Sequence, residues 1–131
     1  KQSVVLLDFE VGHYGDPAFD LGFFLTHLHI KTLIAGTRFN EYANLIDVFW
    51  DAYQQQLQTV LSEADLQALQ QRAALNLGAC LIARVDGKSP VEYLTDLEQE
   101  ACVRQVGWTT LVEEADDLQR VREIMKATML R

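Results

Sequence analysis

Apolar residues recur every three or four positions along most of the chain, and this spacing constrains the fold more than any other feature. The clearest stretch carries apolar or aromatic side chains at Phe39, Tyr42, Leu45, Ile46, Phe49, Trp50, Tyr53 and Leu57. Residues three and four apart share one face of an α-helix, so the stretch predicts an amphipathic helix with its aromatic stripe in the core. An aromatic box that binds a cation is the alternative interpretation of that stripe.

Capping residues predict a helix on each side of this stretch. Asp16-Pro17 combines an N-cap carboxylate with a proline at the first helical position, so a helix begins there and runs to about Ile30. We expect that helix to turn Phe19, Phe23, Leu25 and Leu28 inward. Ser62 followed by Asp65 begins another helix, which Asp86-Gly87 ends.

The C-terminal third is predicted to be helical as well. Ser89, Pro90 and Glu92 form a capping box that predicts a short helical turn. Thr95 with Glu98 repeats the signal and begins a longer helix. The apolar positions of that helix are Leu97, Ala101, Trp108 and Leu111, and those of a last helix over about 117–129 are Leu118, Val121, Ile124, Met125 and Met129. The count is therefore five or six helices.

A single strand is predicted at the N-terminal end. Ser3 to Leu7 is an apolar run with β-branched members, followed by the polar Asp8. One strand cannot satisfy its own backbone N–H and C=O groups, and the sequence offers no second convincing strand. We therefore expect a mainly α fold over residues 1–131, one helical unit with a short N-terminal strand whose partner is missing or comes from another copy.

Composition narrows the classes of partner and compartment. The chain has 131 residues, 49% of them hydrophobic, which suits one domain with one core. A formal net charge of −8 would repel nucleic acid. Neither a membrane span nor a secretory signal is present in the sequence, so we expect a cytoplasmic protein without membrane contact. Cys80 and Cys102 lie inside helical patterns and are interpreted as core thiols.

The candidate chemistry lies between the strand and the first helix. Asp8 directly follows the buried run, where a carboxylate is well placed for a hard cation, so it is the metal-ligand candidate. Termination of the strand and capping of a turn is the alternative role for Asp8. Glu10 is a weaker ligand candidate, and a solvated loop carboxylate is its alternative. The isolated His13, His27 and His29 receive no catalytic role; all three lack convergent neighbours in the sequence.

Two segments stand out as motifs: VVLLDFEVGHYGDPAFDLGFF, residues 4–24, and ARVDGKSPVEYL, residues 83–94. Both resemble segments of the phosphotransferase family that includes aminoglycoside and choline kinases. The resemblance implies the helical subdomain of a protein-kinase-like C-lobe. It also implies that Asp8 holds the magnesium ions that bridge the ATP phosphates, with help from Glu10, and that Gly15, Asp16, Pro17 and Asp20 form a structural motif. Asp16 is expected to cap the helix, and Asp20 to be a buried acceptor that braces the catalytic loop.

Other parts of such a kinase have no counterpart in this sequence. The family's nucleotide-phosphate loop, strand lysine and catalytic aspartate are not found, so we assign no catalytic residue to this chain. We expect a C-terminal fragment that is inactive alone, while the complete enzyme binds Mg²⁺ and ATP and phosphorylates a hydroxyl of an aminoglycoside-like or amino-alcohol acceptor. The alternative is a noncatalytic interaction module that forms a homodimer through Ser3–Leu7 and an exposed apolar patch.

Overall fold

The computed structural model describes residues 3–5, 7, 10 and 12–129 of the chain, and within them it is mainly helical. The elements are α1 (Pro17–Leu33), the short 3-10 helix η1 (Gly36–Arg38), α2 (Phe39–Leu57), α3 (Glu63–Asp86), α4 (Leu97–Val112) and α5 (Leu118–Met129). The predicted mainly α class is confirmed. The second predicted helix begins and ends at the expected residues, whereas the first continues to Leu33, beyond the expected end near Ile30.

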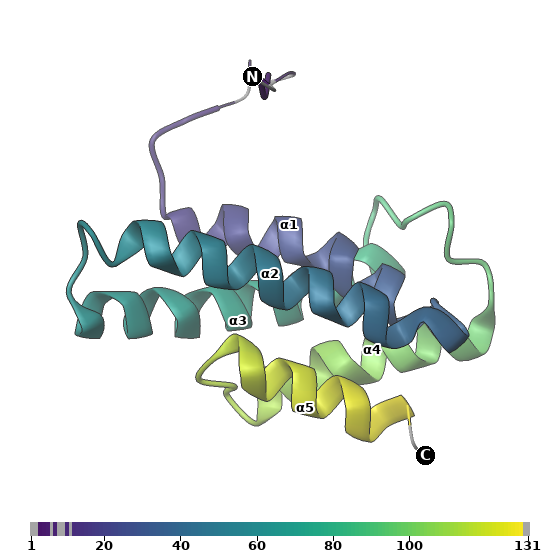
Figure 1. Cartoon of the computed structure of the whole chain (residues 1–131). Coiled ribbons are helices and arrows are strands. Elements are labelled where there is room, and N and C mark those ends of the chain that lie inside the picture. Colours follow the sequence, from purple (N-terminus) through teal and green to yellow (C-terminus); the bar gives the residue numbers. More distant parts are fainter. Residues whose placement is uncertain (1–2, 6, 8–9, 11, 130–131) are drawn as a thin grey trace.

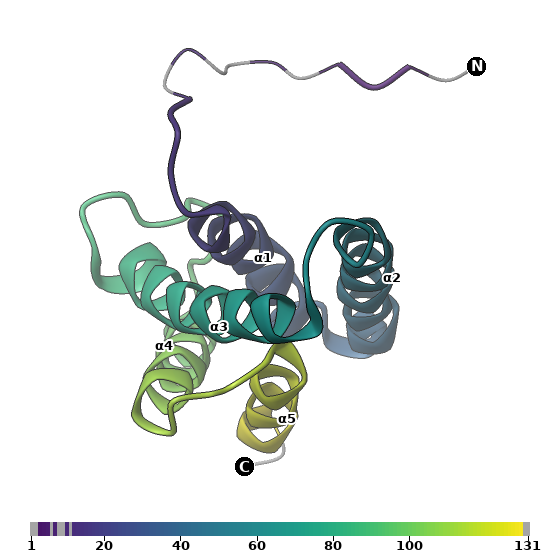
Figure 2. The same cartoon turned by 90° about the vertical axis from the view of Figure 1, so that its left-hand side faces the viewer.

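The helix α3 is the centre of the bundle. It packs against α1 on one side and against α4 on the other, while α2 lies beside α1 and α5 lies beside α4 (Figures 1 and 2). The main core lies between these helices and includes Leu25, Leu77, Leu81 and Val103, none of which is exposed. Each helix therefore buries one face against the central helix or against one of its neighbours.

The aromatic stripe of α2 contributes to a second, smaller core. Phe49, Trp50 and Tyr53 are half-buried and pack against buried residues of α1 and α3, among them Leu66 and Leu69. Their rings also contact one another, with centroids 5.9 Å apart for Phe49 and Tyr53 and 6.0 Å apart for Trp50 and Tyr53. The prediction that this stripe packs in a core is confirmed, although its outer edges reach the surface.

The predicted inner face of α1 was wrong in part. Leu25 is fully buried as expected, but Phe19 is 49% exposed and Phe23 is 40% exposed. The buried face is formed by Ala18, Leu21, Gly22, Leu25, Thr26, His29, Ile30, Thr32 and Leu33. Because α1 is apolar on more than one side, spacing alone did not distinguish the face that meets α3 from the opposite one.

The predicted inner face of α4 was also wrong. Leu97 and Trp108 are exposed, and the buried positions are Val103, Val106, Gly107 and Thr110. Those four residues lie on the face of α4 that meets α3, where Gly107 permits a close approach of the two backbones. The prediction looked for large apolar residues, and neither the small Gly107 nor the polar Thr110 fits that pattern, so this face was missed.

Two further predictions differ from the structure. Where a short helical turn was predicted, residues 87–96 form a loop with a hydrogen-bonded turn, closed by the N–H of Leu94 and the carbonyl oxygen of Val91 at 3.3 Å. Asp96, not Thr95, caps α4 by accepting hydrogen bonds of 2.9 Å from the N–H groups of Glu98 and Gln99. The short N-terminal strand is not confirmed, since Ser3, Val4, Val5 and Leu7 are exposed and lie in no strand. The described residues include no neighbouring strand with which their backbone N–H and C=O groups could form hydrogen bonds.

Candidate functional site

The carboxylate of Asp16 fixes the start of α1. Its Oδ1 accepts a hydrogen bond of 3.0 Å from the backbone N–H of Ala18, and Pro17 occupies the first helical position, so both predictions for this pair are confirmed. Arg72 on α3 donates from Nε to Oδ2 at 2.7 Å and from Nη2 to Oδ1 at 3.3 Å. The Arg72 hydrogen bonds, followed by the bond from Ala18, lower the pKa of the Asp16 carboxyl. The residue has a structural role that ties α1 to α3.

Replacing this cap gives a direct test of its role. We expect Asp16→Ala to lower the free energy of unfolding by about 1 kcal/mol, because a free N–H group at the start of α1 then loses its acceptor. Asp16→Asn keeps a capping oxygen and should retain most of the stability. Urea denaturation followed by circular dichroism measures both variants. Equal losses for Ala and Asn would show that the ion pair with Arg72, not the cap, stabilises this end.

The other carboxylates of the N-terminal motif do not form a site together. Asp8 lies outside the described residues. Glu10 is exposed in a turn. Asp20 was expected to be a buried acceptor, but it is exposed and accepts no hydrogen bond from the described part of the chain. The pKa of the Tyr53 phenol is raised, first by burial and second by the negative charge of Asp20. Its position on the first turn of α1 turns it towards solvent, on the side that faces α2.

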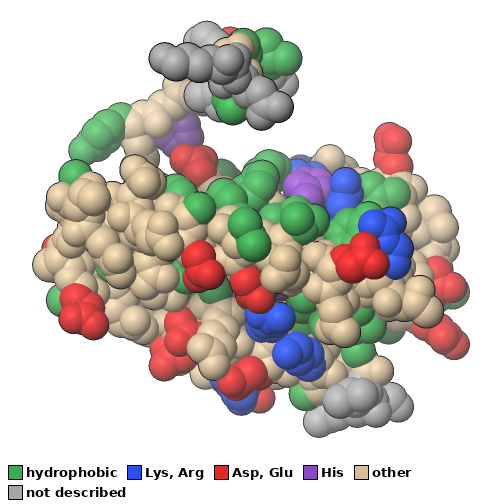
Figure 3. Space-filling view, in the orientation of Figure 1, with side chains coloured by type: hydrophobic (Ala, Val, Ile, Leu, Met, Phe, Trp, Pro, Cys, Tyr) green, Lys and Arg blue, Asp and Glu red, His purple; other side chains and the backbone are tan. Residues whose placement is uncertain are grey.

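A groove of about 690 Å³ lies between α2 and α5, and it is named here the α2–α5 groove. Its lining consists of the carboxylates Asp47, Asp51, Asp117 and Glu123, the amides Gln54, Gln70 and Gln119, the apolar Ile46, Trp50 and Leu118, and the cations Arg122 and Lys126. Acidic and basic side chains border this hollow in Figure 3. The groove combines an aromatic ring with carboxylates and amides, which suits a ligand that carries ammonium and hydroxyl groups.

An ion pair spans the α2–α5 groove. Arg122 of α5 donates from Nη1 to Oδ2 of Asp47 on α2. The Nε of Arg122 and the Nε2 of His29 are buried and have no hydrogen-bond partner among the described residues. The charge of Arg122 contributes to lowering the pKa of His29, so the two side chains lie within electrostatic reach of each other. Asp51, in contrast, is exposed and takes part in no ion pair of the described residues, which leaves its charge available.

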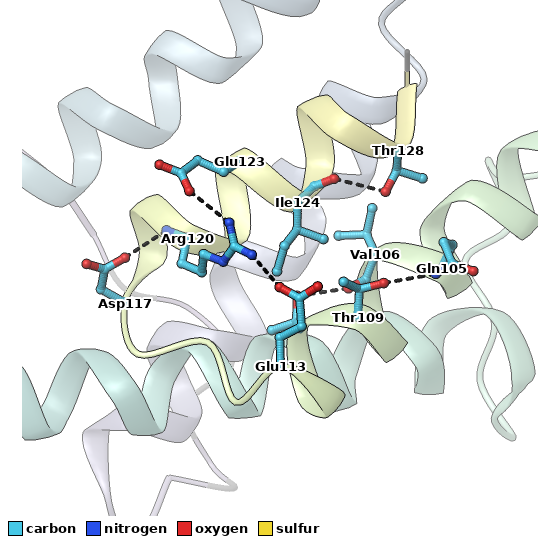
Figure 4. Close-up of polar contacts among 10 residues, drawn as sticks. Gln105, Val106, Thr109, Glu113, Asp117, Arg120, Glu123, Ile124 and Thr128 are labelled. Carbon is cyan, nitrogen blue, oxygen red and sulfur yellow. Dashed lines mark hydrogen bonds and ion pairs between the residues drawn. The ribbon is translucent and has the colours of Figure 1, made fainter. Parts of the chain in front are cut away.

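The wall that α5 contributes is held in place by Arg120 (Figure 4). Its Nη2 lies 2.5 Å from Oε2 of Glu113 at the end of α4, and its Nη1 lies 3.0 Å from Oε2 of Glu123. The backbone N–H of Arg120 also donates to Oδ1 of Asp117 at 2.7 Å. These contacts join the end of α4 to the first turn of α5, and they orient the side of α5 that faces α2.

Neither cysteine belongs to a reactive or metal-binding cluster. Cys80 and Cys102 are free thiols and half-buried, and burial raises the pKa of both. Their thiols stay protonated at neutral pH. Both were predicted to be core thiols, but they lie at the edge of the core, and Cys102 packs against the main core from there. Within the described ranges, no group of three or more His, Cys, Asp or Glu side chains is placed to hold a metal ion.

The sequence did not reveal the α2–α5 groove, because its residues come from three separate segments. One signal was available: Asp47 and Asp51 are four residues apart and therefore share a side of α2, next to the predicted aromatic stripe. Asp117 and Arg122 carried no such signal. Only the packing of α5 on α3 and α4, and of α2 on α1, brings them to the same hollow.

Comparison with known proteins gives no relative from which a function could be transferred. No family model matches the chain, and neither the curated proteins nor the solved structures include a significant match. None of the helices in the described part is long and apolar enough to cross a lipid bilayer.

Proposed function

We propose that this chain is the C-terminal helical part of an ATP-dependent small-molecule kinase that acts in the cytoplasm and resembles the aminoglycoside and choline kinases. In this proposal its helices bind the acceptor whose hydroxyl is phosphorylated. The observation that carries the proposal is the α2–α5 groove of about 690 Å³, a size typical of small-molecule sites. Its carboxylates and Trp50 match an acceptor that carries ammonium and hydroxyl groups.

The nucleotide and its metal belong to the complete enzyme in this proposal. The described residues alone do not make a metal site, and Glu10 is exposed without a neighbouring ligand of that kind. When bound, Mg²⁺ would neutralise charge on the ATP phosphates, with Asp8 as the ligand that the family resemblance implies. We assign no step of phosphoryl transfer to this chain, and we expect no turnover from it alone.

The gene that encodes the chain tests the kinase proposal. We expect the reading frame to continue upstream of Lys1 and to encode a catalytic loop of the HxDxxxxN type, with an aspartate base and a metal-binding asparagine. In that longer protein, Asp8→Ala should abolish turnover. A reading frame without such a loop, or full turnover of the Asp8→Ala variant, would contradict the proposal.

Ligand binding by the α2–α5 groove can be measured on the chain itself. We expect kanamycin or choline to bind in isothermal titration calorimetry, with the affinity falling as salt screens the carboxylates. Asp51→Lys should weaken binding about tenfold. The substitution removes a negative charge and adds a positive one, and each of these two changes costs up to about 1 kcal/mol of binding free energy at a surface site. Glu98→Gln, an exposed acid on α4 outside the groove, should bind as the unmodified chain does. Equal affinities for all three proteins would remove the groove as the acceptor site.

A second candidate function is a noncatalytic interaction module. Exposed aromatic residues on α1, among them Phe19 and Phe23, favour it, since contiguous exposed rings of this kind are typical of protein contacts. This candidate requires no nucleotide and no acceptor.

A further inference from the structure

A row of four exposed or half-buried rings runs along α1 and onto the loop between α3 and α4, and we name it the α1 face: Phe19, Phe23, His27 and Tyr93. Successive ring centroids are 6.0 Å, 5.9 Å and 6.4 Å apart. His27 Nδ1 and Tyr93 Oη are joined by a hydrogen bond of 3.0 Å. Figure 3 shows hydrophobic side chains gathered over α1 beside a histidine and basic side chains. The four rings thus form one continuous surface.

Two cations lie over the rings of the α1 face. The guanidinium carbon of Arg84 is 4.9 Å from the ring centroid of Phe23, and Nζ of Lys31 is 5.7 Å from that of Tyr93. Arg84 is the exception among the described arginines, because each of the others pairs with a carboxylate. Burial and then the charges of Arg84 and Lys31 lower the pKa of His27. Arg84 and Lys31 therefore place two positive charges on the α1 face of a chain whose net charge is −8.

A partner for this face should be apolar and acidic, and the chain's own N-terminal segment has that character. Val4, Val5 and Leu7 are 93%, 72% and 82% exposed, and Glu10 is exposed after them. Figures 1 and 2 show the described residues ahead of α1 standing away from the helices. These side chains lack any packing partner within the described part of the same copy.

We propose that the α1 face binds the N-terminal segment of a second copy of this chain, with Val4, Val5 and Leu7 on the rings and Glu10 beside Arg84. Because each copy has both the segment and the face, the exchange is reciprocal and closes into a twofold dimer. Half-exposed rings contribute about 100 Å² each, so the four rings of one face contribute about 400 Å², and the segment that covers them loses a similar area. Each contact thus buries about 800 Å² and the two contacts about 1,600 Å², which is the size of a stable interface. The inference does not use the α2–α5 groove. It requires a Ser3–Leu7 segment that is not paired in a sheet, so it rests on the interaction-module candidate and not on the kinase proposal.

Sedimentation equilibrium over a wide range of concentration tests the dimer. The full chain should associate to twice its monomer mass of 14.9 kDa. Val5→Asp should raise the dimer dissociation constant at least tenfold, and it cannot unfold the helices because the residue stands outside them. Val112→Asp changes a valine of 75% exposure on α4, away from the α1 face, and should leave the dissociation constant unchanged.

A charge swap tests which residues meet. Arg84→Glu and Glu10→Arg should each weaken the dimer about tenfold, and the double variant should recover most of the affinity. Circular dichroism of each variant shows whether the helices remain folded. If Arg84→Glu does not fold, the dissociation constant of Val5→Asp is the measurement that tests the dimer. A monomer at every concentration, equal effects of Val5→Asp and Val112→Asp, or a folded double variant as weak as the single ones would overturn the proposal.

Discussion

Acidification from pH 6.5 to pH 4 should remove about 3 kcal/mol of stability through His29 alone, because its pKa falls from 6.5 to about 4 on folding. The imidazole is fully buried, and burial is the largest cause of this low pKa. Its Nδ1 lies 2.8 Å from the carbonyl oxygen of Leu25, and since a carbonyl only accepts, Nδ1 carries the proton. The Nε2 that would take up a second proton has no partner among the described residues.

The sign of this effect follows from the state that binds the proton. Below pH 6.5 the unfolded chain protonates His29 while the folded chain keeps the ring neutral, so each further pH unit favours unfolding. The stabilising contribution is complete above pH 6.5 and is lost as the pH falls to about 4. Nearby Arg122 acts in the same direction, because its positive charge disfavours a second cation.

Urea denaturation of the unmodified chain and of His29→Leu between pH 7.5 and pH 4 measures this contribution. Carboxylates also titrate near the lower limit, so the difference between the two pH profiles is the relevant quantity. We expect the profile of His29→Leu to be flatter by about 3 kcal/mol over this interval. His27→Gln removes a less buried imidazole and should retain most of the acid sensitivity. Coincident profiles for the unmodified chain and His29→Leu would contradict the role of the buried ring.

Local signals in the sequence predicted the starts of α1 and α3 and the end of α3, although they missed the end of α1 and the cap of α4. The caps of α1 and α3 depend on residues within a few positions of each other, as in the hydrogen bond from Asp65 N–H to Ser62 Oγ. The end of α3 at Asp86-Gly87 is likewise a local property of the chain. Such contacts form wherever the segment becomes helical, so no knowledge of the rest of the fold is needed to predict them.

Contacts between distant segments could not be predicted in the same way. Phe23 and Leu25 are both large and apolar, and only the position of α3 decides that Leu25 is buried while Phe23 faces outward. The α2–α5 groove depends in the same way on where α5 packs on α3 and α4 and where α2 packs on α1, which no spacing in the sequence encodes. The sequence therefore predicted the elements, but not which of their faces would form the core or the site.

The crossing of α1 and α3 leaves no room for an added side chain at Gly22. A Cβ atom at Gly22 would lie 2.6 Å from Cβ of Asn76, 2.8 Å from the backbone nitrogen of Leu77 and 3.0 Å from the backbone oxygen of Ala73. Two of these atoms belong to the α3 backbone, which cannot move aside as a flexible side chain would. The absence of a side chain at Gly22 thus sets the distance between the two helices that share the main core.

We expect Gly22→Val to lower the free energy of unfolding by about 3 kcal/mol, since overpacking a closely packed interior costs about this much. Gly22→Ala should lose less, because a gain in helix propensity of about 1 kcal/mol offsets part of the clash. The control is Gly36→Ala, where an added Cβ meets nothing within 4 Å and only the positive φ of 57° is strained. That strain costs about 1 kcal/mol. If Gly22→Val lowered the free energy of unfolding no more than Gly36→Ala does, the close crossing of α1 and α3 would be refuted.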